Sequence, residues 1–471
     1  MLAKFYDVIV VGENLAGLIA AALLAGRKYS VLLIRQMTPP GGGSLYGSMA
    51  HRQKNNYPGI FDLPVPATVL RELNLGHKVR GSFKPISPLF QILSAGHRLT
   101  VFSDRNRFFE EIRREFGKDV KSSDVSGLFR RLDDVGAVFD RFLTPDLPYH
   151  PDGMKQKWNL SRREKEFDSD LDKVDGLIES LTRAFEKDST GRLMAAVEGN
   201  AGQMSFGFDS IFAYRRAKSL FQEVLYQVEG ESIDELFTER IKTRNGTVID
   251  SFKLQEFDKK KGTYHFSDSK GTYSSQNLIA ATDLFSLPDL FNDQKLEKYV
   301  SNTMKDIRPT HVWLKLNLLL DRNVIPEGME FYLYQFGRNV QNESEMLAYY
   351  RDPLSGDDMD VERLEIRQPI AIDKFNAEGC RQAQQNMLEQ VRQVIPFMDD
   401  HLRKVYLEKP PAEGQSTSSL NRIAGRDLLY GSYKDTGLFR GVSYHLPWKN
   451  AYLAGPEVLP ELGFEGDFIT G

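Results

Sequence analysis

Six residues near the amino terminus have the types and the spacing of a phosphate-binding turn. Gly12 and Gly17 enclose residues 13–16, directly after the apolar run 8–11 and directly before an apolar helical pattern over residues 18–24. This order predicts a buried strand, a tight turn and a helix. The helix would begin with unpaired N–H groups and the positive end of its dipole, which together can hold a diphosphate.

Asn14 stands where a G-x-G-x-x-G turn has its middle glycine. That glycine lets the backbone approach the phosphates closely, and a side chain there reduces the space. Asparagine tolerates left-handed backbone and can itself donate a hydrogen bond. We therefore expect the turn to bind a diphosphate more weakly, with Gly12 and Gly17 still serving the turn and the helix packing.

The second predicted strand, residues 30–34, is followed by Arg35 and Gln36. A dinucleotide-binding fold usually has an acid at this point, which accepts hydrogen bonds from the ribose hydroxyls. Arg35 can instead favour a 2′-phosphate, which would indicate NADP, and Gln36 can still hydrogen-bond a ribose. Arg35 can equally be a surface residue at a strand end. The sequence leaves these interpretations open.

The composition is that of a large globular chain. It has 471 residues, of which 41% are hydrophobic and 27% charged, so we expect two or three lobes. A formal net charge of −4 gives no reason to expect nucleic acid as a partner. The single cysteine, Cys380, excludes an internal disulfide and indicates a reducing compartment. The eight histidines lack metal-ligand spacing and no G-x-S-x-G motif occurs, so we predict neither a metal site nor a serine hydrolase.

No leader peptide or membrane-spanning segment is predicted. The first strand begins by residue 7, and the longest apolar stretch, residues 15–25, is too short to cross a bilayer. We therefore expect a cytoplasmic protein, and peripheral contact with a membrane stays open. Residues 155–187 are dense in both signs of charge with apolar residues at helical spacing, which predicts solvent-facing helices of a separate lobe.

The remaining predicted elements alternate between helices and strands. Helices are expected over residues 105–116, 232–242 and 377–394, and strands over 251–257, 262–267, 277–282, 312–319 and 331–336. His97 and Arg98, and likewise Trp313 and Lys315, could face a substrate or simply hold strand positions, and the second interpretation is favoured. No catalytic residue stands out.

Six motifs along the chain resemble those of FAD-dependent oxidoreductases of the amine oxidase and phytoene desaturase group. They lie at residues 10–18, 41–44, 229–236, 245–248, 278–282 and 451–466. The resemblance implies an α/β fold, with a doubly wound, Rossmann-like FAD-binding domain of the glutathione-reductase type and an inserted α+β substrate domain. The FAD/NAD(P)-binding domain would comprise residues 1–82, 231–290 and 416–471. The substrate domain, with its helical insertion, would comprise residues 83–230 and 291–415.

The same resemblance implies which residues contact the cofactor. They are Gly12, Asn14, Leu15, Ala16, Gly17, Arg35, Gln36, Gly42, Gly43, Ser44, Leu254, Ala281, Thr282, Gly455, Pro456, Glu457, Gly463, Phe464 and Gly466. The last motif of the group normally runs into a long helix that faces the pyrophosphate. Because this chain stops at Gly471, we expect at most one turn of that helix.

Two functions are compatible with these motifs. The first is an FAD-dependent oxidoreductase, desaturase-, saturase- or amine-oxidase-like, that acts on an apolar small molecule and leaves the hydride chemistry to the flavin. The second is a non-catalytic or structural homologue that has lost tight FAD binding and serves as a partner subunit. The second is supported by the residues at Asn14, Arg35, Ser44 and Glu231 and by the short terminus, and the first is preferred. An NADP-linked reductase rests on Arg35 alone, and either a homo-oligomer or a protein partner is compatible with each function.

Overall fold

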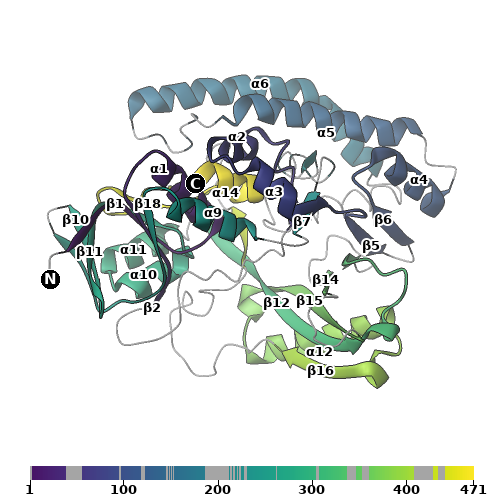
Figure 1. The fold of residues 1–471 in the computed structure, drawn as a ribbon. Coiled ribbons are helices and arrows are strands. Elements are labelled where there is room, and N and C mark those ends of the chain that lie inside the picture. Colours follow the sequence, from purple (N-terminus) through teal and green to yellow (C-terminus); the bar gives the residue numbers. More distant parts are fainter. Residues whose placement is uncertain are drawn as a thin grey trace.

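The computed structural model (Figure 1) describes the chain in segments. They are residues 3–38, 56–94, 97–117, 122–144, 153–185, 231–260, 262–303, 307–336, 346–352, 360–407, 428–432 and 441–471, together with 147, 149, 151, 212, 215, 218–219, 221 and 224–227. The predicted cofactor contacts Gly42, Gly43 and Ser44 therefore lie outside the described residues.

A seven-stranded sheet carries the amino-terminal turn. Its strands follow the order β8 (Gly246–Lys253), β2 (Val31–Thr38), β1 (Lys4–Val11), β11 (Gly271–Ala280), β10 (Thr263–Asp268) and β9 (Glu256–Lys260), and β18 (Ala451–Leu453) also pairs with β11. The pairs that link β8, β2, β1, β11 and β18 are parallel, whereas β9 and β10 add antiparallel pairs at one edge. This doubly wound arrangement confirms the fold class predicted from the sequence.

Both faces of this sheet are buried because its central strands are apolar at successive positions. Val8 and Val10 pack toward α1 (Leu15–Gly26) and α9 (Ile233–Lys242), whereas Ile9 and Val11 face the main core. Helix α14 (Phe464–Thr470) packs against α1. At seven residues α14 forms about two turns. The predicted limit of one turn is wrong, because the helix begins two residues before Gly466 and not after it.

An eight-stranded sheet forms the outer lobe. Its strands follow the order β16 (Leu402–Leu407), β12 (Ile307–Asp321), β15 (Val361–Ala371), β14 (Leu347–Asp352), β13 (Tyr332–Phe336), β5 (Phe90–Ser94) and β6 (His97–Val101), and β17 (Leu428–Ser432) pairs with β12. Helix α12 (Ala377–Val394) packs on β12 and β15 and begins and ends where the sequence predicts. Trp313, on β12, is buried in the core, as favoured for this residue.

A layer of helices lies along one side of the molecule. Figure 1 shows α5 (Ser122–Phe142) and α6 (Met154–Phe185) along the top of the view, with α4 (Arg105–Phe116) beside them. The other elements are α2 (Pro64–Glu72), α3 (Gly76–Ser82), α10 (Leu287–Phe291), α11 (Gln294–Thr303) and a three-stranded sheet of β3 (Asn56–Pro58), β7 (Val224–Gln227) and β4 (Phe83–Pro85). The helical prediction for residues 155–187 is confirmed over residues 155–185, which belong to one continuous helix, α6. Residues 186–187 lie outside the described residues. In the segments given above, no helix combines the length and the apolar character that crossing a bilayer requires.

Candidate functional site

The turn after β1 passes very close to the end of β11. Gly12 has a φ of +111°, and a Cβ atom added there would lie 2.1 Å from the carbonyl oxygen of Ala281. A Cβ atom added to Gly17 would lie 2.1 Å from the Ala281 Cβ. Both positions therefore require glycine, one for the turn and one for the helix packing. This close approach brings the amino-terminal end of α1 to the carboxyl ends of β1 and β11.

The Asn14 side chain joins two distant segments at this point. Its Oδ1 accepts a hydrogen bond from the Gly17 N–H at 2.8 Å, and its Nδ2 donates to the Ala454 carbonyl oxygen at 2.6 Å. Asn14 is the N-cap of α1 in extended backbone, with φ −64°, and only 6% of it is exposed. Asn14 therefore does not adopt a left-handed backbone conformation, but its side chain does donate a hydrogen bond.

Two backbone N–H groups in the first turn of α1 have no hydrogen-bond acceptor among the described residues. Within the described residues, no protein atom accepts from the N–H of Leu15 or Ala16. Ala16 is fully buried and Leu15 half-buried. These are the amides that a diphosphate at the helix N-terminus would use.

The carboxyl-terminal segment closes over the same end of α1. The Ala454 N–H donates to the Ala280 carbonyl oxygen at 2.9 Å, which fixes this segment to β11. A Cβ atom added to Gly455 would lie 2.9 Å from both Asn14 Nδ2 and Glu457 Oε2. The Glu457 side chain is 2% exposed. The space beside Gly455 is thus bordered by a carboxamide and a buried carboxylate.

Arg35 and Gln36 both contact Glu13 in the turn. The Arg35 guanidinium lies 2.6 Å from a Glu13 carboxylate oxygen and 3.1 Å from Asp250, and Gln36 Nε2 donates to Glu13 at 3.3 Å. Burial alone would lower the pKa of Arg35, but the two carboxylates outweigh it and raise that pKa. The acidic residue beside the end of β2 is therefore Glu13, which belongs to the turn after β1, and not a residue of β2 itself. Because Arg35 is engaged by two carboxylates, the interpretation as an NADP 2′-phosphate site loses its support.

The other predicted contact residues lie around this end of the sheet. The Leu254 N–H donates to the Thr38 carbonyl oxygen at 2.9 Å, so this amide is engaged within the protein. Thr282 follows Ala281 and is 2% exposed. Pro456 adjoins Gly455, and Gly463, Phe464 and Gly466 form the start of α14. The structure therefore brings Gly12, Asn14, Gly17, Ala281, Gly455 and Glu457 together. Leu254 lies just beyond the carboxyl end of β8, beside Thr38.

A buried ion-pair cluster lies behind α14, and sequence reasoning did not find it. Arg215, 1% exposed, forms two hydrogen bonds with Glu465, at 2.9 and 2.7 Å, and a third with Asp140 on α5 at 2.6 Å. Desolvation would lower the pKa of Arg215, but Glu465 and Asp140 raise it. An arginine in the segment around residue 215 carries no local signature. Only Glu465 lies within a motif that the sequence displays.

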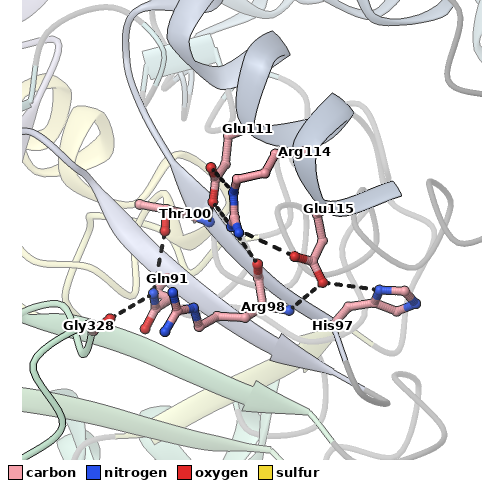
Figure 2. Close-up of polar contacts among 8 residues, drawn as sticks. All are labelled: Gln91, His97, Arg98, Thr100, Glu111, Arg114, Glu115 and Gly328. Carbon is pink, nitrogen blue, oxygen red and sulfur yellow. Dashed lines mark hydrogen bonds and ion pairs between the residues drawn. The ribbon is translucent and has the colours of Figure 1, made fainter. Parts of the chain in front are cut away.

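His97 and Arg98 hold a strand to a helix. Figure 2 shows that the Arg98 N–H and the His97 ring both contact Glu115 of α4, at 2.9 and 3.2 Å. The Thr100 N–H likewise donates to Glu111 at 3.1 Å. Because β6 is an edge strand, these carboxylates cover N–H groups that would otherwise be open to another strand.

Replacement of Glu115 by alanine tests this role. We expect Glu115→Ala to lower the free energy of unfolding by about 1–2 kcal/mol, because a partly buried acceptor for the β6 backbone is lost. Glu110→Ala, at an exposed neighbouring position paired with Arg113 at 3.6 Å, should change it by less than about 0.5 kcal/mol. Denaturant titration measures both. Equal losses in the two variants would contradict the edge-strand role.

The fold joins a largely parallel sheet, with a glycine turn at the head of α1, to a mostly antiparallel outer sheet. Three solved structures, two of them of an amine oxidase, have a similar fold. An oxidoreductase from Methanosarcina mazei has a TM-score of 0.51 at 12% identity, over 98% of each chain. A mutant of putrescine oxidase has 0.53 at 12%, and the wild type bound to putrescine 0.50 at 13%, each over 100% of this chain and 97% of the other. No protein-family model matches the sequence, and comparison with curated proteins finds no match. The likeness defines the fold alone.

The two segments that the motif resemblance places against the diphosphate of FAD are bonded to each other. The Asn14–Ala454 hydrogen bond of 2.6 Å joins the start of α1 directly to the segment at Gly455, so these side chains do not suit the diphosphate as they lie. The buried Glu457 side chain borders the same space beside Gly455. Elsewhere in the described segments, no three or more His, Cys, Asp or Glu side chains gather to hold a metal ion.

Proposed function

We propose that this chain is a non-catalytic binding protein built on the amine oxidase fold, a partner subunit that has given up tight FAD binding. The observation that carries the proposal is the Asn14 carboxamide, which bonds to both Gly17 and Ala454 at the place where the diphosphate would lie. A ligand there would have to break two buried hydrogen bonds before forming its own.

The ribose corner supports the same conclusion. At the ribose corner, Glu13 is already neutralised by Arg35 and hydrogen-bonded by Gln36. The carboxylate that could accept from a ribose hydroxyl is thus engaged within the protein.

A flavin titration tests the proposal. We expect the purified full chain to show no visible flavin absorbance and no change in flavin fluorescence or melting temperature when FAD is added. Replacement of Asn14 by glycine should produce measurable FAD binding, because the bridging side chain is removed and the amides of Leu15 and Ala16 become reachable. Asn74→Gly, at an exposed position with a φ of +54°, is the matched control and should leave the protein as unresponsive as the wild type.

Each outcome of this titration is informative. Flavin in near-stoichiometric amount in the wild-type protein would overturn the proposal. If neither the wild type nor Asn14→Gly took up FAD, the loss of flavin would stand, but the Asn14 side chain would not be its cause.

The second candidate is an FAD-dependent oxidoreductase that acts on an apolar small molecule. It is favoured by the two glycines that keep the turn tight and by the N–H groups of Leu15 and Ala16 at the helix start. In that case the Asn14 side chain must turn away from Ala454 on binding. The same titration supports this candidate if FAD raises the melting temperature of the wild type and tints the protein.

A further inference from the structure

One face of α6 exposes apolar and cationic side chains in a single stripe. Met154, Trp158, Arg162 and Lys165 are spaced by four, four and three residues, so they lie above one another on the helix. Met154 is 88% exposed and Trp158 64%, which places both among the most exposed large apolar side chains of the described chain. We call these four residues the α6 stripe.

The opposite side of α6 fixes the helix to the protein. Leu160 and Phe167 lie on that side and are 9% and 3% exposed, and Phe167 contacts Phe139 and Phe142 of α5. Figure 1 shows α6 as the outermost layer at the top of the molecule. The stripe is therefore held on a rigid helix and directed away from the core.

The stripe lies in a strongly basic segment. Between Met154 and Lys165 the chain has five lysines and arginines and one acid, whereas the whole chain has a net charge of −4. The Arg162 guanidinium lies 5.7 Å from the centre of the Trp158 ring, so the apolar and cationic parts are in contact. Within the described residues, the carboxylate near Arg162 is Glu166, at 3.7 Å on the surface, and Lys165 has none.

A cavity of about 620 Å³ adjoins the stripe between α5 and α6. Its lining includes the cations Arg141, Arg162, Arg163 and Lys165, the acids Glu166 and Asp170, and the rings of Phe142 and Phe167. Asp170 pairs with Arg141 at 2.9 Å, and Glu166 lies 3.7 Å from Arg162. Arg163 donates to the Thr144 hydroxyl at 2.7 Å. Since the cations outnumber the acids beside an apolar wall, the cavity suits an anionic head group with hydrocarbon attached.

We propose that the α6 stripe is a contact site for an anionic lipid bilayer. Trp158 and Met154 enter the interfacial region, and Arg162 and Lys165 lie against lipid phosphates and carboxylates. An exposed tryptophan next to cations suits this interface, since indole favours the head-group level and basic residues are attracted to anionic lipids. The acidic balance of the rest of the chain restricts the contact to this face.

Vesicle binding of the full chain tests the proposal. Vesicles of phosphatidylcholine with phosphatidylserine should sediment the protein and shift its tryptophan emission to the blue, whereas vesicles of phosphatidylcholine alone should do neither. Trp158 dominates this response because Trp313 is only 7% exposed and Trp448 is half-buried. High salt should release the protein, since the attraction is largely electrostatic.

Two pairs of substitutions separate the contributions. Arg162→Gln with Lys165→Gln should weaken vesicle binding by about fivefold for each charge removed. Met154→Ser with Trp158→Ser should abolish sedimentation. Phe397→Ser, at a 72% exposed position on another surface, is the matched control and should bind like the wild type.

Three outcomes would overturn the proposal. They are equal binding to both vesicle types, full binding by the Met154 and Trp158 variant, and loss of binding in the Phe397 control with a melting temperature equal to that of the wild type. The readout does not involve flavin. A failure here is therefore distinguishable from a failure of the proposed function.

Discussion

Arg215→Met is expected to lower the free energy of unfolding by about 3–5 kcal/mol. The substitution leaves Glu465, which is 4% exposed, without the guanidinium that now makes two hydrogen bonds to it. A buried carboxylate without a cation is far less stable than one in water, so the substitution destabilises the folded state relative to the unfolded state. The same change releases Asp140, and hence α5, from α14. Denaturant-induced unfolding followed by circular dichroism measures the difference.

Arg105→Met is the matched control for this prediction. Arg105 also makes two hydrogen bonds to a carboxylate, at 2.8 and 2.7 Å to Asp133, but both side chains are more than 40% exposed. We expect a loss below about 1 kcal/mol, because water solvates the remaining acid. If the two variants lost equal stability, burial would not be the cause. Adding Glu465→Met to Arg215→Met should restore part of the loss, since the uncompensated charge is then removed.

Gly12→Ala is expected to cost at least about 3 kcal/mol of stability. The added methyl group would lie 2.1 Å from the Ala281 carbonyl oxygen, a backbone atom held by the pairing of β11 with β1. The backbone at Gly12, with φ +111°, is also strained for any residue with a side chain. The turn must shift, and the Asn14 bridge to Ala454 shifts with it. Thermal and denaturant unfolding measure the cost.

Gly81→Ala provides the comparison, because a Cβ atom there meets no atom within 4 Å. Gly81 lies in helix α3, where alanine is favoured, so its replacement should raise stability by up to about 1 kcal/mol. A Gly12→Ala protein as stable as the wild type would show that the turn can relax at little cost. It would also contradict the tight approach of α1 to β11.

Much of the fold is predictable from the sequence because it rests on local periodicity. The apolar run before Gly12 and the apolar pattern after Gly17 specify a strand and a helix with both faces buried. Helix α12 begins and ends where the periodicity predicts, and the strand predicted over 312–319 is the centre of the longer β12. Its ends extend to 307 and 321 because they pair with β17 and β15, which the local pattern does not record.

The site is less predictable because its contacts connect positions far apart along the chain. The Asn14 side chain bonds across 440 residues to Ala454, and Arg215 bonds across 250 residues to Glu465. Even the pairing of Glu13 with Arg35 depends on how the turn lies against the end of β2. The types of residue at 14 and 35 show that the usual contacts are changed. Only the fold shows that the replacements bond to other parts of the protein.

The hydrogen bond between Asn14 and Ala454 has a consequence for synthesis of the protein. The first strand and helix emerge from the ribosome well before β18 and the segment that accepts from Asn14, which follow about 440 residues later. Until that segment is made, Asn14 lacks its Ala454 acceptor and the sheet is incomplete. Such a long sequence separation slows completion of the sheet, so the apolar residues of β1 and α1 stay exposed to solvent for longer in the nascent chain.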